Sequence, residues 1–238
     1  MGEGLGVRAS SSAAKQSLEV AWLGWRVSVR EKVRKISYMP LQPFGYLLFK
    51  LYFRLRGVGV EHIPKEGPGI IAPNHVSYAD PPLVAALVPR MLHFMMLHEH
   101  YYHPYFHWLF KRLPCIPIRQ GRVNAESLKE SLQVLESGEL LCVFPEGGRS
   151  KDNRLMSPMP GVALLALKTE APVIPAGING GFEAYGPHLS FPRPKRVTIN
   201  FGPPLIFKKE ENPSKERLRE VSQEIMERIG ALLDKKGA

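Results

Sequence analysis

From Gly57 to the end of the chain, short apolar runs alternate with longer stretches in which apolar residues recur every three or four positions. The short runs have the length of buried strands, and the longer stretches have the period of helices that cover a sheet. We expect strands over residues 58–63, 69–74, 92–97, 115–119, 139–146, 172–178 and 196–202. We expect helices over residues 82–89, 102–112, 124–137, 160–170 and 213–235. This alternation predicts an α/β sandwich with helices on both faces of a mostly parallel sheet.

The segment before Gly57 has a different pattern. Residues 1–17 are small and polar, which is typical of a disordered tail. Residues 18–56 contain two apolar segments with basic residues along their flanks, and Trp22 and Trp25 lie on the first apolar stripe. Tryptophan and arginine both suit the headgroup region of a bilayer, so we expect an amphipathic two-helix membrane anchor here. The alternative is a helix that packs on the main domain, which would occupy residues 57–238.

No apolar stretch in this segment is long enough to cross a bilayer. Between Phe44 and Phe53 the only charged residue is Lys50. That stretch is about half the ~20 residues that a transmembrane helix needs. We therefore expect a peripheral or monotopic protein without a transmembrane span.

The net charge of the chain indicates which class of partner it binds. The formal net charge is +10, from 32 Lys and Arg against 22 Asp and Glu, which implies an anionic partner. Residues 1–56 carry ten basic and three acidic residues, whereas residues 57–186 carry eleven and twelve. Most of the excess of basic over acidic residues therefore lies before the main domain. This favours an anionic bilayer surface over nucleic acid as the partner. Cys115 and Cys142 lie inside apolar runs, as expected for a reducing compartment, so we place the protein at the cytoplasmic face of a membrane.

Two loops carry residues that could do chemistry. In the first, His75 and Asp80 follow an apolar run and precede a helical stretch. If the turn brings them together, the carboxylate orients the imidazole and stabilises it after it takes a proton. The structural alternative is a His that caps a helix with Asp in its first turn. A third polar residue of this loop, Ser77, lacks the surroundings of a nucleophilic serine, and we expect it to cap the helix.

The second loop follows another apolar run, Glu139–Val143, and reads Phe-Pro-Glu-Gly-Gly-Arg-Ser from Phe144 to Ser150. Its glycines allow the backbone to approach a ligand closely, and Arg149 can hold a phosphate through two hydrogen bonds. A plain solvated turn is the alternative.

Together these loops resemble the phospholipid and glycerol acyltransferase family, of the lysophosphatidic acid acyltransferase type. Four motifs of that family occur in order between residues 74 and 175. They are N-H-x-x-x-x-D at Asn74, His75 and Asp80, a run ending in Arg119 with Arg122 close by, F-P-E-G-x-R-S at Phe144–Ser150, and an apolar run at Ala171–Pro175.

The resemblance implies a glycerol-phosphate-acyltransferase-like αβα sandwich. It also implies acyl transfer from acyl-CoA or acyl carrier protein to the free hydroxyl of lysophosphatidic acid, giving phosphatidic acid. His75 would be the general base and Asp80 its orienting carboxylate. The acceptor would be bound by Asn74, Arg119, Arg122, Glu146, Gly147, Gly148, Arg149, Ser150 and Pro175. Because a thiolate leaves readily, we expect neither a metal ion nor a cofactor.

Other readings stay open at this point. After the third motif many members carry a lysine where this chain has Leu155–Gly161, so the acceptor could be another lysophospholipid, a glycerol phosphate or an aminolipid. A non-catalytic basic module that binds lipid or nucleic acid belongs to a different class, but it would have no use for a base and its orienting acid. His98, His100, His103 and His107 could hold zinc, although a packed aromatic helix explains them better.

Overall fold

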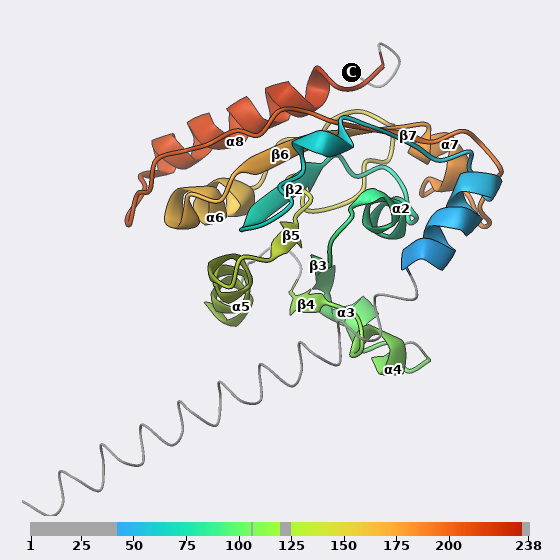
Figure 1. Ribbon diagram of the computed structural model, residues 1–238, viewed down its shortest axis with the longest axis horizontal. Coiled ribbons are helices and arrows are strands. Elements are labelled where there is room, and N and C mark those ends of the chain that lie inside the picture. The colour runs from blue at the N-terminus through green and yellow to red at the C-terminus, as the bar shows by residue number, and fades with distance from the viewer. Residues whose placement is uncertain (1–41, 106, 120–124, 235–238) are drawn as a thin grey trace, which may run out of the picture.

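The computed structural model describes residues 42–105, 107–119 and 125–234 (Figure 1). The expected tail, the first part of the expected anchor and Arg122 lie outside the described residues.

Within the described residues, seven strands form one sheet in the order β1-β7-β6-β2-β5-β3-β4. All neighbouring strands are parallel except β6 and β7, so the prediction of a mostly parallel sheet is confirmed. The strands are β1 (Arg56–Val58), β2 (Gly69–Pro73), β3 (Leu92–Leu97), β4 (Cys115–Ile118), β5 (Leu140–Cys142), β6 (Val173–Asn179) and β7 (Thr198–Phe201).

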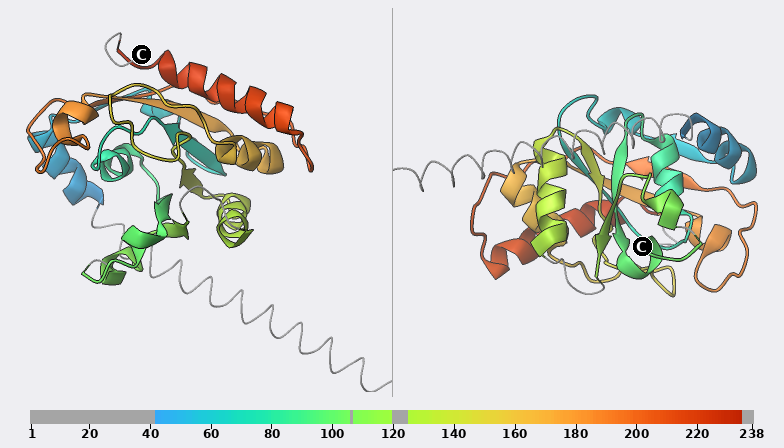
Figure 2. Two further views of the ribbon diagram at one scale, coloured as in Figure 1. Left: turned by 180° about the vertical axis from the view of Figure 1, so that it is seen from behind. Right: turned by 90° about the horizontal axis from the view of Figure 1, so that it is seen from below.

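Helices cover both faces of this sheet (Figures 1 and 2). One face is covered by α5 (Ala125–Glu136), α6 (Gly161–Thr169) and α8 (Lys215–Gly230), which pack against one another. The other face is covered by α2 (Asp80–Leu87), α7 (Gly181–Tyr185) and a helix over residues 42–52, which is blue in Figure 1. Two short helices, α3 (His98–Tyr101) and α4 (His107–Phe110), follow β3 and lie beside its end and β4.

The sheet separates two apolar cores, and β2 shows why its sequence is apolar throughout. Ile70 and Ala72 pack into the core under α5, α6 and α8, whereas Ile71 packs into the core under α2. Successive side chains of a strand point to opposite faces, so a strand buried on both sides has no place for a polar residue. All five residues of β2 are buried.

Some expected elements differ from the structure. The strand expected over residues 58–63 ends at Val58, because Gly59 adopts a left-handed φ of 72° and begins the 3-10 helix η1 (Val60–His62). Of the helix expected over residues 102–112, only α4 is helical in the structure, and Pro104 lies before its start. The helix α3 precedes the expected range. The helix α7 was not expected, since five residues are too few to show a helical period. The expected boundary between anchor and domain, at residues 56 and 57, falls inside β1.

The parallel arrangement brings the loops after β2, β3, β5 and β6 to one edge of the sheet. In open α/β sheets, ligands bind in the crevice outside the carboxyl ends of the strands. Both chemistry-bearing loops of the sequence leave this edge, one after β2 and one after β5.

Candidate active site

His75 and Asp80 form a hydrogen-bonded pair at the start of α2. His75 Nδ1 lies 2.8 Å from Asp80 Oδ2, and the same oxygen accepts from the backbone N–H groups of Val76 (2.8 Å) and Ser77 (2.7 Å). The side chain of Asp80 is fully buried, whereas that of His75 keeps 16% of its surface exposed. The carboxylate therefore favours the proton on Nδ1 and leaves Nε2 to act on a substrate.

The loops after β2 and β5 are fastened to each other around the His75 ring. The imidazole stacks on the Phe144 ring, with centroids 4.0 Å apart and 22° between planes. The backbone N–H of His75 donates to Glu146 Oε1 at 2.8 Å, and its carbonyl accepts from Ser150 N at 2.8 Å. The orientation of the imidazole is thus determined by groups on both loops.

Glu146 is buried and uses both carboxylate oxygens within the protein. Oε1 accepts from His75 N, and Oε2 accepts from Met156 N at 2.8 Å. Burial raises the pKa of Glu146 above its ordinary value of 4.5, and the amides of Met156 and His75 act in the opposite direction. Because both oxygens are occupied by backbone amides, Glu146 joins two loops rather than facing a ligand.

Arg149 lies flat on an aromatic ring. Its Cζ is 3.6 Å from the centroid of the Tyr78 ring, and that ring in turn packs against Tyr185 with centroids 5.3 Å apart. Among the described residues, no carboxylate forms an ion pair with Arg149. The face of the guanidinium is therefore used by Tyr78, while its in-plane N–H groups remain suited to a phosphate.

A cleft of about 1520 Å³ runs past these groups. Its walls are mostly apolar and come from β3, from α2 and from the helix over residues 42–52. The site residues that line it are His75, Tyr78, Arg119, Gly147, Gly148, Arg149 and Lys151. A cleft of this kind can accommodate a long apolar chain together with an anionic group.

The structure brings some of the expected site residues to the cleft and not others. Asn74 is buried, and its side chain pairs with the backbone of Ile178 in β6 (Oδ1 to N, 2.6 Å; Nδ2 to O, 3.3 Å). Ser150 is buried, and its Oγ accepts from Arg154 N. Pro175 lies inside β6, opposite Ala72 of β2. Together with Glu146, these residues lie behind the residues that line the cleft.

The expectation that Ser77 caps α2 is wrong. The N-cap position is Ala79, which makes no side-chain capping bond. Ser77 Oγ instead accepts from Ala79 N and donates to Tyr185 O, each at 3.0 Å. The hydroxyl is buried and joins the loop after β2 to the end of α7, so it is not placed as a nucleophile.

Sequence reasoning missed Tyr78 and Lys151. Tyr78 lies in the loop between His75 and Asp80. An aromatic residue in such a loop is not needed for the core, and this could have marked it as part of the site. Lys151 follows Ser150 directly and lines the cleft, so a cation is present there although this chain lacks the lysine that many family members carry further along.

Two further sets of side chains belong to chemically reactive types, the histidines in and around α3 and α4 and the two cysteines. Within the described parts of the chain, no three His, Cys, Asp or Glu side chains are grouped so as to hold a metal ion. His107 Nδ1 lies 3.0 Å from the carbonyl oxygen of Tyr101, so this ring nitrogen is used in a hydrogen bond within the protein. Burial and the nearby charge of Asp80 raise the pKa of the Cys142 thiol well above 9.0, so this thiol stays protonated and does not act as a nucleophile.

Comparisons with known proteins agree with this geometry. The 1-acyl-sn-glycerol-3-phosphate acyltransferase of Bacillus subtilis is 28% identical over 193 residues, covering 78% of this chain and 94% of that protein. The enzyme of the same name from Limnanthes douglasii is 29% identical over 170 residues, covering 68% of this chain and 60% of that protein. The crystal structure of the LPA acyltransferase PlsC from Thermotoga maritima superposes with a TM-score of 0.69 at 28% identity, over 90% of this chain and 88% of that one.

The family model named Acyltransferase matches residues 54–179. That range contains the His75–Asp80 pair, the Phe144–Ser150 loop and the strands that bring them together. The range also contains β3 and α2, which form apolar walls of the cleft. The chain therefore belongs to the acyltransferase family.

Proposed function

We propose that this acyltransferase moves a fatty acyl group from a thioester, acyl-CoA or acyl carrier protein, to the free hydroxyl of lysophosphatidic acid. The product is phosphatidic acid, a step of phospholipid biosynthesis. The observation that carries this proposal is the His75–Asp80 pair in a mostly apolar cleft beside Arg149. The relatives from Bacillus subtilis and Limnanthes douglasii are named 1-acyl-sn-glycerol-3-phosphate acyltransferase, which supports the same acceptor.

In the proposed reaction, His75 Nε2 takes the proton of the acceptor hydroxyl as its oxygen attacks the thioester carbonyl. Asp80 stabilises the imidazolium that forms. The new C–O bond forms and the C–S bond breaks, so the thiolate leaves while the proton is on Nε2. The imidazolium then gives this proton to the thiolate, which restores the neutral base. Backbone N–H groups of the glycine-bearing loop stabilise the negative charge on the carbonyl oxygen during the attack.

The phosphate of the acceptor is proposed to bind at the cations that line the cleft. Arg149 presents its N–H groups in a fixed plane, and Arg119 and Lys151 add positive charge. In this proposal Glu146, Asn74 and Ser150 hold the loops in place through hydrogen bonds and do not touch the acceptor, which departs from the expectation. Pro175 lies inside β6 and does not touch the acceptor either.

The acyl donor is a substrate in this proposal, and no metal or cofactor takes part. The acyl chain lies along the apolar walls formed by β3, α2 and the helix over residues 42–52. The enzyme works at the cytoplasmic surface of an anionic membrane, from which its acceptor is drawn. Within the described residues, no helix is long and apolar enough to cross a bilayer.

The test offers the purified full chain a panel of acceptors with palmitoyl-CoA or palmitoyl carrier protein, and identifies products by mass spectrometry. The acceptors are lysophosphatidic acid, lysophosphatidylcholine, glycerol 3-phosphate and an aminolipid. We expect phosphatidic acid as the main product. Preferred acylation of any other acceptor would overturn the assignment of the acceptor, and no acylation at all would overturn the proposed function.

A further inference from the structure

Two segments far apart in the sequence expose large apolar side chains on the same part of the molecule. On the helix over residues 42–52, Phe44 is 68% exposed and Leu51 is 72% exposed. In the loop over residues 187–196, here called the Phe191 loop, Phe191 is 79% exposed. Leaving such side chains in water costs free energy, so clustered exposure of this kind marks an interaction surface.

Hydrogen bonds hold the Phe191 loop against the end of this helix. Tyr52 Oη donates to Pro192 O at 2.9 Å, and Arg54 Nη2 donates to Pro194 O at 3.3 Å. Val197 N donates to Phe53 O, and Val197 O accepts from Arg56 N, each at 3.0 Å. Helix and loop therefore form one continuous surface.

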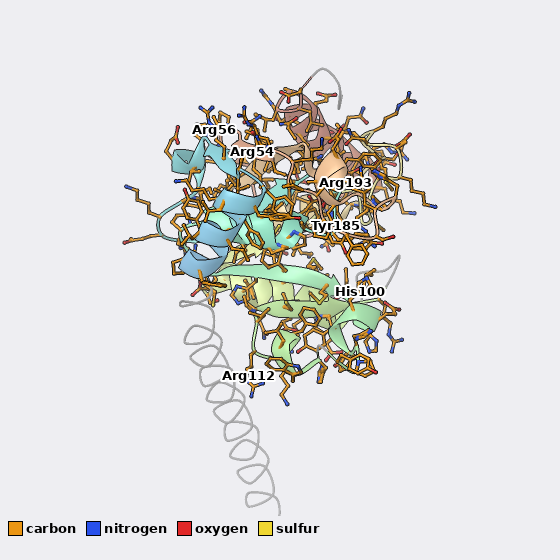
Figure 3. The ribbon with its side chains drawn as sticks, turned by 90° about the vertical axis from the view of Figure 1, so that its right-hand side faces the viewer. Arg54, Arg56, His100, Arg112, Tyr185 and Arg193 are labelled. Carbon is orange, nitrogen blue, oxygen red and sulfur yellow. The ribbon has the colours of Figure 1, made fainter. Side chains whose placement is uncertain are left out.

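This surface is also basic. Residues 42–56 and 187–197 together carry six Lys or Arg and no Asp or Glu. All six of these side chains are exposed: Lys50, Arg54, Arg56, Arg193, Lys195 and Arg196. Figure 3 looks onto this side of the molecule, where Arg54, Arg56 and Arg193 are labelled around the blue helix and the end of α7. Exposed apolar side chains together with exposed cations match the chemistry of an anionic lipid surface.

The same surface adjoins the catalytic cleft. Phe44, Leu48 and Phe49 of the helix line the cleft, and so does Pro187 at the start of the Phe191 loop. A lipid entering from this side would pass from the bilayer to the cleft without crossing open water.

We propose that the Phe191 loop is a second membrane contact, beside the helix over residues 42–52, and that the occupant of this surface is an anionic bilayer. Phe191 enters the boundary between headgroups and acyl chains, and Arg193 and Lys195 contact lipid phosphates. The inference rests on the proposed function only in taking the acceptor to be a membrane lipid. It needs no contribution from residues 1–41.

The test measures cosedimentation of the full chain with vesicles of phosphatidylcholine, with and without phosphatidylglycerol. Phe191→Ser should weaken binding to the anionic vesicles about five- to tenfold, since it removes the aromatic ring that would be buried in the bilayer. Ile206→Ser is the matched control. Ile206 is 75% exposed but lies next to Leu205, which pairs with Val173 at the opposite end of β6 from the Phe191 loop. Equal binding by the two variants would overturn the proposal.

A charge-matched pair tests the cations. Replacing Arg193 and Lys195 by Ser should weaken binding about tenfold or more and reduce its salt dependence, because both cations are attracted to the anionic surface. Replacing the exposed Lys208 and Lys209 by Ser removes the same charge elsewhere and should change binding much less. Equal losses in the two double variants would show that only net charge matters and would contradict the proposal.

A fluorescent label reports insertion directly, even if a Ser variant proves unstable. Cys115 and Cys142 are buried, so a thiol-reactive, polarity-sensitive dye will react at an introduced Phe191→Cys and not at the native thiols. Its emission should shift to the blue on anionic vesicles, whereas the dye at Ile206→Cys should not respond. An unchanged spectrum at position 191 would refute insertion.

The proposed function is scored separately. Acyl transfer to detergent-dispersed lysophosphatidic acid should be the same in Phe191→Ser and in the unmodified chain. If the unmodified chain transfers no acyl group but the vesicle results hold, the proposed function fails and the membrane surface stands. If transfer occurs and Phe191→Ser binds vesicles like Ile206→Ser, the proposed function stands and the proposed membrane surface fails.

Discussion

At the scale of single residues, the site depends on how one carboxylate is used. Asp80 Oδ2 accepts from His75 Nδ1 and from two backbone amides, whereas Asp80 Oδ1 is buried and has no hydrogen-bond partner among the described residues. A side chain at Gly181 would bring its Cβ within 3.1 Å of Oδ1, so the absence of a side chain there leaves room for the carboxylate. The three contacts to one oxygen fix the orientation of the carboxylate and, through it, that of the imidazole.

The Tyr78 ring is expected to position Arg149 for the acceptor phosphate. Tyr78→Phe keeps the aromatic face and should leave the kinetics nearly unchanged. Tyr78→Leu removes an interaction of about 0.5–2 kcal/mol and should raise the KM for lysophosphatidic acid about threefold to thirtyfold, with a smaller change in kcat. Steady-state kinetics with the acceptor varied would measure this, and equal KM values for the two variants would refute the positioning role.

At the scale of elements, the loops after β2 and β5 behave as one unit because backbone groups join them. His75 N bonds to Glu146, His75 O accepts from Ser150 N, and Glu146 continues to Met156 N. Through these bonds the loop after β5 helps to hold His75 in place, and Glu146 has this role without contacting the substrate. Its turn requires Gly147, whose φ is 66° and where a Cβ would lie 2.2 Å from Met159 Sδ.

Gly147→Ala and Gly148→Ala form a matched pair at this turn. The first places a side chain in the left-handed region and against Met159, so it should lower the free energy of unfolding by about 1–3 kcal/mol. At Gly148 no atom lies within 4 Å of an added Cβ, and φ is not positive, so stability should change little. Denaturant unfolding of both variants measures this, and similar losses of stability would contradict the role of the turn.

The buried carboxyl of Glu146 should give stability a pH dependence. Burial raises its pKa above 4.5, so the folded chain holds this proton more tightly than the unfolded chain does. The free energy of unfolding should therefore fall as pH rises from about 4.5 through the raised pKa, and level off above it. In Glu146→Gln this part of the slope should be absent, and stability should drop by about 1–3 kcal/mol because an amide group meets a backbone N–H.

The exposed Glu136 offers the control for Glu146. Glu136→Gln removes one carboxyl from the surface of α5 and should keep the pH slope of the unmodified chain. Unfolding measured across the acidic range for all three proteins would decide the matter. The same slope in Glu146→Gln as in the unmodified chain would contradict the account.

At the scale of the whole molecule, the sequence predicts the central strands β2, β5 and β6 well, because they are buried on both faces and read as apolar runs. It predicts the edge strand β1 poorly, because two of its three residues are exposed. It also predicts that His75, Asp80 and Arg149 meet at one site, because each belongs to a short motif at the end of such a run, and their roles in the reaction stay predictions. It does not predict that Asn74 and Ser150 lie behind the cleft, since motif membership says nothing about which way a side chain points. The membrane contact proposed for the Phe191 loop could not be predicted either, because it depends on a helix more than a hundred residues away in the sequence.

The central claim is that His75 removes the proton from the acceptor, and kcat of His75→Ala with lysophosphatidic acid and an acyl-CoA, followed by thiol release, tests it most directly. The contacts of His75 with Glu146 and Ser150 are made by its backbone, so the variant should fold and keep a cooperative unfolding transition. The account predicts that kcat falls by about a thousandfold or more. A folded His75→Ala variant with kcat within about tenfold of the unmodified chain would contradict it.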